Sequence, residues 1–396
     1  MRRAALLALA CLAAATPARA LYDWQGETWS LGLDGAGRSF TFVTRGDAAE
    51  RQAVSTQRLR LDATLRLGGG ARVDAAGDFT AVLGTGGATA FALPSATDWR
   101  WRDLDATVER GDGYSLLRDL DRLALSVRRA DMTLCAGRQA VTLGNALLLP
   151  SLDLFAPFTP GALDTEYKRG VDALRLGRAF GLRGEAELIA VAHADSLDAG
   201  ALLARGRLDL GGVSATLLGG VGMHEPFAGV SLSTDLGGTG YYAEGLARAG
   251  RHRDDTWRLT VGAQRQLLAD LSAALEFQHD SFGATSVDGY LAAAQVPEIR
   301  RGEAFLLGRD YLALNLNWQA RPLLALSLFA LRNLHDASML LEPALNWDFA
   351  QEAAIGAGGL YGLGKGTHPG PFGIAVPRSE FGTLPDTVFA ELRFYF

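Results

Sequence analysis

Alternation of apolar and polar residues is clearest in the stretch Arg58-Leu59-Arg60-Leu61-Asp62-Ala63-Thr64-Leu65-Arg66-Leu67. Successive side chains of a β-strand point to opposite faces, so this pattern predicts a strand with one leucine-rich face and one charged face. The same period returns at 257–264, 271–278 and 312–319. Helical spacing is hard to find along the chain, which indicates an all-β protein.

The length of these runs separates a membrane barrel from a soluble sandwich, which can also show such alternation. The runs cover about 10 to 13 residues, whereas soluble strands centre on about 5 to 6 and tilted membrane-spanning strands need about 9 to 11. After residue 20 no apolar segment is long enough for a transmembrane helix. We therefore predict a transmembrane antiparallel β-barrel.

The first twenty residues have the features of a signal peptide. Arg2 and Arg3 precede an apolar run over 4–15, and Ala18-Arg19-Ala20 has the form of a signal-peptidase site. Cleavage after Ala20 leaves a mature chain of 21–396 with 35 basic and 44 acidic residues, a net charge of −9 that disfavours nucleic acid as a partner. It also leaves Cys135 as the only thiol, which excludes an intrachain disulfide.

The strand count and the connections fit an outer-membrane barrel. The segments number about 18, with tight turns on one side and long loops over 84–117, 142–169, 282–307 and 364–385 on the other. Short periplasmic turns and long extracellular loops are typical of such barrels, and closure is required because lipid cannot satisfy an open sheet edge. A count of 16 stays open, because glycine blurs the period in the first and seventeenth segments.

The chain ends in an alternating strand whose apolar face finishes on aromatic residues. Its apolar positions are Val388, Ala390, Leu392, Phe394 and Phe396. This terminus resembles the C-terminal signal by which bacterial outer-membrane barrels are recognised for insertion. The resemblance implies a place in the cell outer membrane, in contact with its lipid. It also implies that the barrel-assembly machinery binds the Phe396 strand.

The face opposite the leucines carries many charges, and nearly all the cations are arginines. Burying unpaired ions in a dry core would cost several kcal/mol each, so the lumen should contain water or a dense network of ion pairs. Pairing between neighbouring strands, which would only stiffen the wall, is the alternative for each residue. One wall leans basic and the other acidic. The predicted pore-lining residues are Arg58, Arg60, Arg66, Arg122, Arg128, Arg175, Arg205, Arg207, Glu276, Glu342 and Glu391.

The segment 142–169 is too apolar for an extracellular loop in water, so we expect it to fold into the barrel. Gly137-Arg138-Gln139 leads into it, and it contains Asp153-Leu154-Phe155-Ala156-Pro157-Phe158 and Glu166-Tyr167-Lys168-Arg169-Gly170. Here the chain resembles Gram-negative porins and alginate-export-like barrels, in which a third loop narrows the pore. The resemblance implies that Arg138 and Gln139 stand at the pore wall, with Asp153, Asp164 and Glu166 on the constricting loop. Strict alternation instead puts Arg138 on the outer face, unless Gly137 sits in a bulge.

Catalytic and metal-binding patterns are weak. None of the six histidines has a histidine partner three or four residues away, so no metal site is predicted. We expect no cofactor and no enzymatic activity. The sequence favours a porin-like channel for passive passage of small hydrophilic solutes, anions among them. A polymer-export or assembly scaffold plugged by its own loops, or an outer-membrane hydrolase, are the alternatives.

Overall fold

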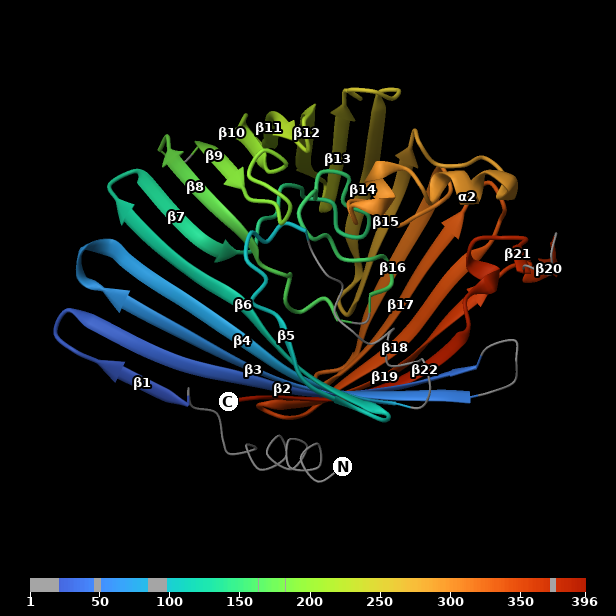
Figure 1. Ribbon diagram of the computed structural model, residues 1–396, viewed down its shortest axis with the longest axis horizontal. Coiled ribbons are helices and arrows are strands. Elements are labelled where there is room, and N and C mark those ends of the chain that lie inside the picture. The colour runs from blue at the N-terminus through green and yellow to red at the C-terminus, as the bar shows by residue number, and fades with distance from the viewer. Residues whose placement is uncertain (1–20, 46–50, 85–97, 163, 182, 371–374) are drawn as a thin grey trace.

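Eighteen antiparallel strands form the wall of one closed barrel in the part of the chain that the computed structural model describes, which is residues 21–45, 51–84, 98–162, 164–181, 183–370 and 375–396 (Figure 1). The predicted signal peptide lies outside these residues. The wall strands are β2 (Trp29–Arg45), β3 (Arg51–Leu67), β4 (Ala71–Gly84), β6 (Tyr114–Arg129), β7 (Met132–Gln139), β8 (Val171–Ala179), β9 (Gly184–Val191), β10 (Ala201–Asp209), β11 (Val213–Gly222), β12 (Glu225–Leu236), β13 (Thr239–Arg248), β14 (Thr256–Leu268), β15 (Leu271–Asp280), β16 (Asp310–Arg321), β17 (Leu324–Asn333), β18 (Met339–Ala350), β19 (Ala353–Leu363) and β22 (Asp386–Tyr395).

The barrel closes where the first wall strand meets the last. β2 pairs with β22 in a continuous antiparallel register from Arg45 opposite Asp386 to Ala36 opposite Tyr395. The wall strands that were uncertain in the sequence, β2 and β19, are both present. The prediction of an 18-stranded antiparallel barrel is therefore confirmed.

The two faces of the wall differ as the alternation predicts. Leu202 and Leu217 lie on the outer face and are each 63% exposed, whereas Leu203, the next residue along β10, is 1% exposed and faces inward. An outer face of exposed leucines suits lipid, because hydrocarbon chains neither donate nor accept hydrogen bonds. The buried apolar core lies inside the barrel, between the wall and a loop.

Turns on the predicted periplasmic side are short. Gly237 and Gly238 join β12 to β13, and both have positive φ, +61° and +74°. A two-residue hairpin turn of this twist needs left-handed backbone at both central positions, which glycine adopts without strain.

The long loops contain short elements that the alternation did not predict. Residues 84–117, expected to be loop, include β5 (Ala106–Gly111) and the start of β6 at Tyr114, which together form a hairpin. The loop before β16 holds α2 (Tyr290–Ala293) and α3 (Pro297–Arg300), and the last loop holds the β20 (Thr367–Pro369) and β21 (Ala375–Pro377) pair. Among the described residues no helix combines the length and the apolar character that crossing a membrane requires.

An extra strand covers part of β2 beyond the end of β22. The C-terminal residue Phe396 exchanges backbone hydrogen bonds with Gly35, which leaves the β2 edge before Gly35 without a β22 partner. β1 (Tyr22–Gln25) folds back on this edge, pairing Tyr22 with Leu33 and Gln25 with Ser30. The uncovered backbone groups are thereby satisfied, as lipid surroundings require.

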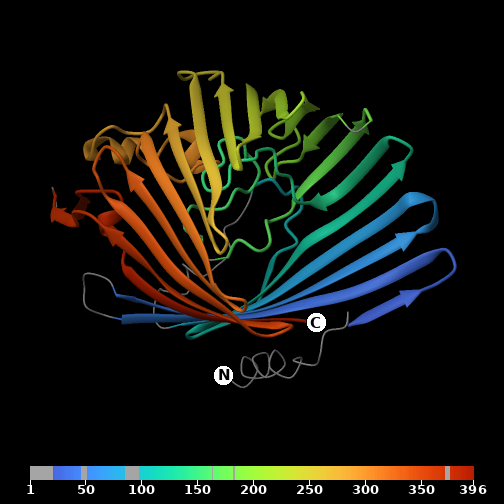
Figure 2. The ribbon, with the colours of Figure 1, turned by 180° about the vertical axis from the view of Figure 1, so that it is seen from behind.

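The third loop, which we define as residues 140–170 between β7 and β8, lies inside the ring of strands (Figures 1 and 2). Apart from turns and bends, its described residues (140–162 and 164–170) have no regular secondary structure. The wall must therefore supply partners for its backbone groups.

Candidate functional site

Two buried glutamates of the wall bind the first half of the third loop. Glu276 of β15 accepts the backbone N–H groups of Leu147 at 2.7 Å, Leu148 at 3.0 Å and Leu149 at 2.7 Å, and the Tyr242 hydroxyl at 2.6 Å. Glu244 of β13 accepts the N–H groups of Asn145, Ala146 and Leu152. Hydrogen bonds to a charged acceptor are the strong kind. These carboxylates accept hydrogen bonds from backbone N–H groups that a helix or a sheet would otherwise pair.

Apolar contacts close the space between the loop and the wall on the same side. Leu152 and Phe155 pack with Ile189 and Leu203 on the inward faces of β9 and β10. Further round the wall, Leu149 packs against Tyr311 and Leu331. The lumen between this half of the loop and strands β8–β13 is therefore a dry core.

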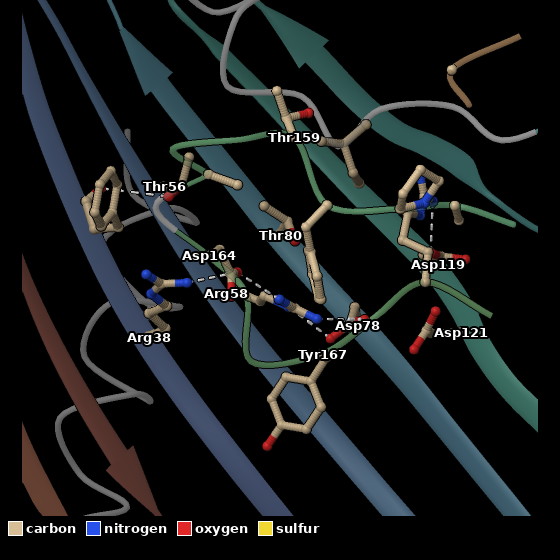
Figure 3. Close-up of a pocket in the computed structure, with 18 of the residues that line it drawn as sticks. Arg38, Thr56, Arg58, Asp78, Thr80, Asp119, Asp121, Thr159, Asp164 and Tyr167 are labelled. Carbon is tan, nitrogen blue, oxygen red and sulfur yellow. Dashed lines mark hydrogen bonds and ion pairs between the residues drawn. The ribbon is translucent and has the colours of Figure 1, made fainter. Parts of the chain in front are cut away.

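A cavity of about 550 Å³ lies on the opposite side of the third loop. It is bounded by β2, β3, β4 and β6, by residues 156–169 of the loop and by residues 301–305 (Figure 3). Arg38, Arg58, Asp78, Asp164 and Tyr167 line it, together with aromatic side chains such as Phe40 and Phe158. The open part of the lumen is thus next to the basic wall.

Ion pairs attach the loop to this wall at Asp164. The Asp164 carboxylate lies 2.6 Å from Arg38 Nη1 and 2.9 Å from Arg58 Nη1. Each arginine also holds a carboxylate of the wall, since Arg58 donates to both oxygens of Asp78 and Arg38 donates to Glu391. Guanidinium groups suit such paired contacts because their donors form a planar fork.

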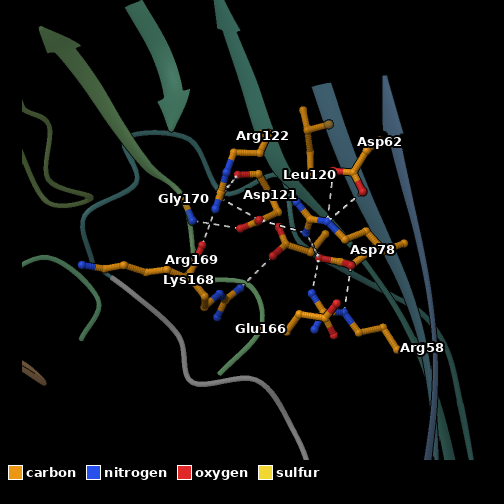
Figure 4. A network of polar contacts seen from close by, with 12 residues as sticks. Arg58, Asp62, Asp78, Leu120, Asp121, Arg122, Glu166, Lys168, Arg169 and Gly170 are labelled. Carbon is orange, nitrogen blue, oxygen red and sulfur yellow. Dashed lines mark hydrogen bonds and ion pairs between the residues drawn. The ribbon is translucent and has the colours of Figure 1, made fainter. Parts of the chain in front are cut away.

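Deeper in the wall the charges form a connected network (Figure 4). Arg60 is 3% exposed and forms ion pairs with Asp62, Asp78 and Asp121. Its guanidinium carbon Cζ lies 4.2 Å from the centre of the Tyr167 ring. A register shift between β4 and β6 turns two consecutive residues, Asp121 and Arg122, to the lumen. Arg122 then pairs with Asp121 and donates to the Lys168 carbonyl.

A second group of ion pairs joins the third loop to the segment before β5. Arg100 and Arg169 both contact Asp105 and Asp119 at 2.7–2.9 Å. Burial and a hydrogen bond with Asp119 raise the pKa of Asp105 to about 6. Within the loop itself Lys168 pairs with Asp153, and burial raises the pKa of Asp153 and lowers that of Lys168.

The other predicted pore-lining residues have different surroundings. Arg175 and Arg205 share Glu187, and Arg205 reaches the Thr142 carbonyl. Glu276 does not line an open pore, because the loop covers it completely. Arg207 is exposed and donates to Ser214. Arg66 and Arg128 are exposed near the periplasmic turns. Glu342 is half-buried, and Glu166 is exposed at the edge of the lumen.

The structure places Arg138 away from both the lumen cavities and the lipid. β7 pairs with β6 without a register shift, and Arg138 stands opposite Leu123 and Asp172, so no bulge at Gly137 turns its side chain inward. Arg138 is buried and donates to Asp172 and to the carbonyls of Leu120 and Arg102. The neighbouring Gln139 is also buried and donates to the Ala173 carbonyl. The pair ties the wall together at the entry to the third loop.

Two further spaces lie in the lumen beside the third loop. A space of only about 10 Å³ lies between Arg38, Arg58, Arg60, Tyr167 and Arg393. A cavity of about 520 Å³ on the periplasmic side is lined by Leu147 and Leu148 and by polar and charged side chains, among them Asp235, Gln264, Arg265 and Asn315. Arg38 and Arg58 line both this small space and the large cavity beside the third loop.

Solved structures of two proteins share this fold. The chain is similar to OccAB1 of Acinetobacter baumannii, with a TM-score of 0.55 and 12% identity over 95% of this chain and 99% of that one. OccAB4 of the same organism gives a TM-score of 0.54 and 10% identity, over 96% and 100%. The chain folds as an outer-membrane porin-like β-barrel. No family model matches the sequence of this porin-like barrel, and no curated protein matches it either.

Three residues of the porin-like barrel's lumen were absent from the predicted site. Arg38 belongs to the strand in which glycine blurred the period, although it stands directly opposite Arg58. Tyr167 lies inside the motif of the third loop, and Glu244 has the same inward position as Glu276. Among the described residues no group of histidine, cysteine, aspartate and glutamate is placed to hold a metal ion.

Proposed function

We propose that this barrel is a channel for passive passage of small hydrophilic solutes across the outer membrane, with a preference for anions. The observation that carries the proposal is the asymmetric position of the third loop. It packs against β8–β13 and leaves a cavity of about 550 Å³ beside the arginines of β2 and β3. A solute would pass along these arginines, which filter by size and charge. The barrel catalyses no reaction.

Conductance of the purified barrel in a planar lipid bilayer tests this function. We expect steady ohmic openings, with a reversal potential in a KCl gradient that indicates chloride selectivity. Far-ultraviolet circular dichroism and resistance to unfolding by SDS without heating establish that the barrel is folded. A folded barrel that stays silent over repeated insertions would contradict the proposal.

A plugged scaffold for polymer export or assembly is the second candidate. The observation that favours it is the apolar core that the third loop forms with β8–β13, which fills that side of the lumen. A silent, folded barrel that co-purifies with a periplasmic partner would support this alternative.

A further inference from the structure

We propose that the cavity of about 520 Å³ on the periplasmic side of the lumen is a binding site for uncharged, hydroxyl-rich solutes such as a pyranose sugar. The inference rests on the proposed function and deepens it, because it identifies a class of solute that the lumen binds. The volume lies within the range of about 300 to 1,000 Å³ that small-molecule sites have. None of the arginines of β2 and β3 lines this cavity.

The pairing of β14, β15 and β16 forms a trough in the wall. Two neighbouring rows of the register each place a small residue of β15 between an amide of β14 and an amide of β16. The rows are Gln264–Ala274–Asn315 and Gln266–Ser272–Asn317. All six residues, which we call the amide trough, line the cavity. Neighbouring strands lie about 4.8 Å apart, so the backbones that carry the two amides of a row are roughly 10 Å apart, with only a small side chain between them.

Most of these amides are available to a ligand. In the parts of the chain that the structure describes, the side chains of Gln264, Asn315 and Asn317 make no hydrogen bond, whereas Gln266 donates to the Leu268 carbonyl at 2.7 Å. A side-chain amide has an acceptor oxygen and two N–H donors. It can therefore bind two neighbouring hydroxyl groups of a sugar, one as donor and one as acceptor.

The charges in the cavity lining balance each other. One acid and one base belong to the lining, Asp235 and Arg265. Asp235 accepts the Gly238 N–H at 3.3 Å, and Arg265 donates to the Thr239 hydroxyl at 3.2 Å, both near the β12–β13 turn. Because ligands and sites are matched in charge, a lining without net charge favours an uncharged solute over an ion.

Leu147 of the third loop adds an apolar surface to the same cavity. It lies inside the ring of strands, yet it is 51% exposed. Its backbone N–H is held at 2.7 Å by Glu276, which stands one pair beyond Ala274 on the inward face of β15. A pyranose ring has hydroxyl groups at its edge and C–H groups on its faces. Leu147 is placed to cover such a face while the amide trough binds the edge.

Saturation-transfer difference NMR of the purified barrel, in a detergent without a sugar headgroup, tests the site with methyl α-glucoside as the probe. The wild type should bind the sugar, and the double substitution Asn315→Leu, Asn317→Leu should weaken the affinity roughly tenfold, because two hydrogen-bonding amides are lost. Gln319→Leu is the matched control. Gln319 lies on the same face of β16 but outside the cavity, where it donates to the Arg321 carbonyl, so its loss should leave the affinity unchanged.

Three results would overturn the sugar site. The first is a folded wild-type barrel that gives no saturation transfer to the sugar. The second is an equal loss of affinity in the Gln319→Leu control, which would place the binding elsewhere on the wall. The third is an equal response of the double variant to triethylene glycol dimethyl ether, an uncharged solute without hydroxyl groups, which would show that the trough does not recognise hydroxyl groups.

The bilayer measurement separates this proposal from the proposed function. A folded barrel that is silent in the bilayer but binds the sugar through Asn315 and Asn317 would refute the channel and retain the site. A barrel that conducts ions but does not bind the sugar would refute the site and retain the channel.

Discussion

Buried carboxylates of individual wall residues hold the third loop in place. The contribution of each to the free energy of unfolding can be measured by substitution. Glu276→Gln removes the negative charge of the carboxylate. The new amide also brings N–H donors next to the backbone N–H groups of Leu147, Leu148 and Leu149, which need an acceptor. We expect the free energy of unfolding to fall by about 2 to 4 kcal/mol, because hydrogen bonds to charged groups contribute about 1.5 to 3 kcal/mol each. Denaturant titration followed by tryptophan fluorescence measures the loss.

Glu342→Gln is the matched control at the same scale. Glu342 also faces the lumen, but it is half-buried and no hydrogen bond to its side chain is seen in the described residues. Its replacement should change the free energy of unfolding by less than about 0.5 kcal/mol. Equal losses in the two variants would show that the loop does not depend on Glu276 in particular.

At the scale of elements, the third loop behaves as a piece of core. Leu152 is fully buried between the loop and the wall, and its Cδ2 occupies the space that a side chain at Gly229 would need. Leu152→Ala should lower the free energy of unfolding by about 2 to 5 kcal/mol. The exposed Leu147 gives the control, since Leu147→Ala removes the same atoms at little cost. Matching losses would mean that the packing seen around Leu152 is not stabilising.

The elements could be predicted from the sequence wherever one face had to meet lipid. That requirement produces strong alternation, as in β3 and β15, and the alternation predicted the eighteen strands. The β5 hairpin was missed because it extends beyond the apolar band, where alternation has no physical cause. The partners of Glu244 and Glu276 could not be predicted either, since the backbone groups that they bind lie far earlier in the chain, 98 residues for Ala146 and Glu244 and 129 residues for Leu147 and Glu276.

For the whole molecule, the charge of the lumen should change with pH near Asp105. Its pKa, raised by burial and by Asp119 to about 6, lies above the ordinary value of 3.8. The protonated form is therefore favoured in the folded barrel, and the stability it gives is complete below pH 3.8 and lost as the pH rises through about 6. Over the same range the basic wall gains a negative charge, so chloride selectivity should fall.

Reversal potentials between pH 4.5 and 7.5 measure this change. Asp105→Asn should show a smaller change in selectivity around pH 6 than the wild type, because its side chain cannot lose a proton. Asp112→Asn, at the exposed tip of the β5–β6 hairpin, should titrate as the wild type does. A wild-type selectivity that does not vary with pH would contradict the raised pKa of Asp105.

The seam between β2 and β22 also has a consequence for how the barrel is made. Arg38 and Glu391, which meet across it, are 353 positions apart in the chain. Bringing such distant segments together costs loop-closure entropy before any seam hydrogen bond can form, so the seam should be slow to form. Until the final strand has been synthesised, β2 has no partner on that side. The barrel can therefore close only after β22 has been synthesised, and the chain must be kept from aggregating until then.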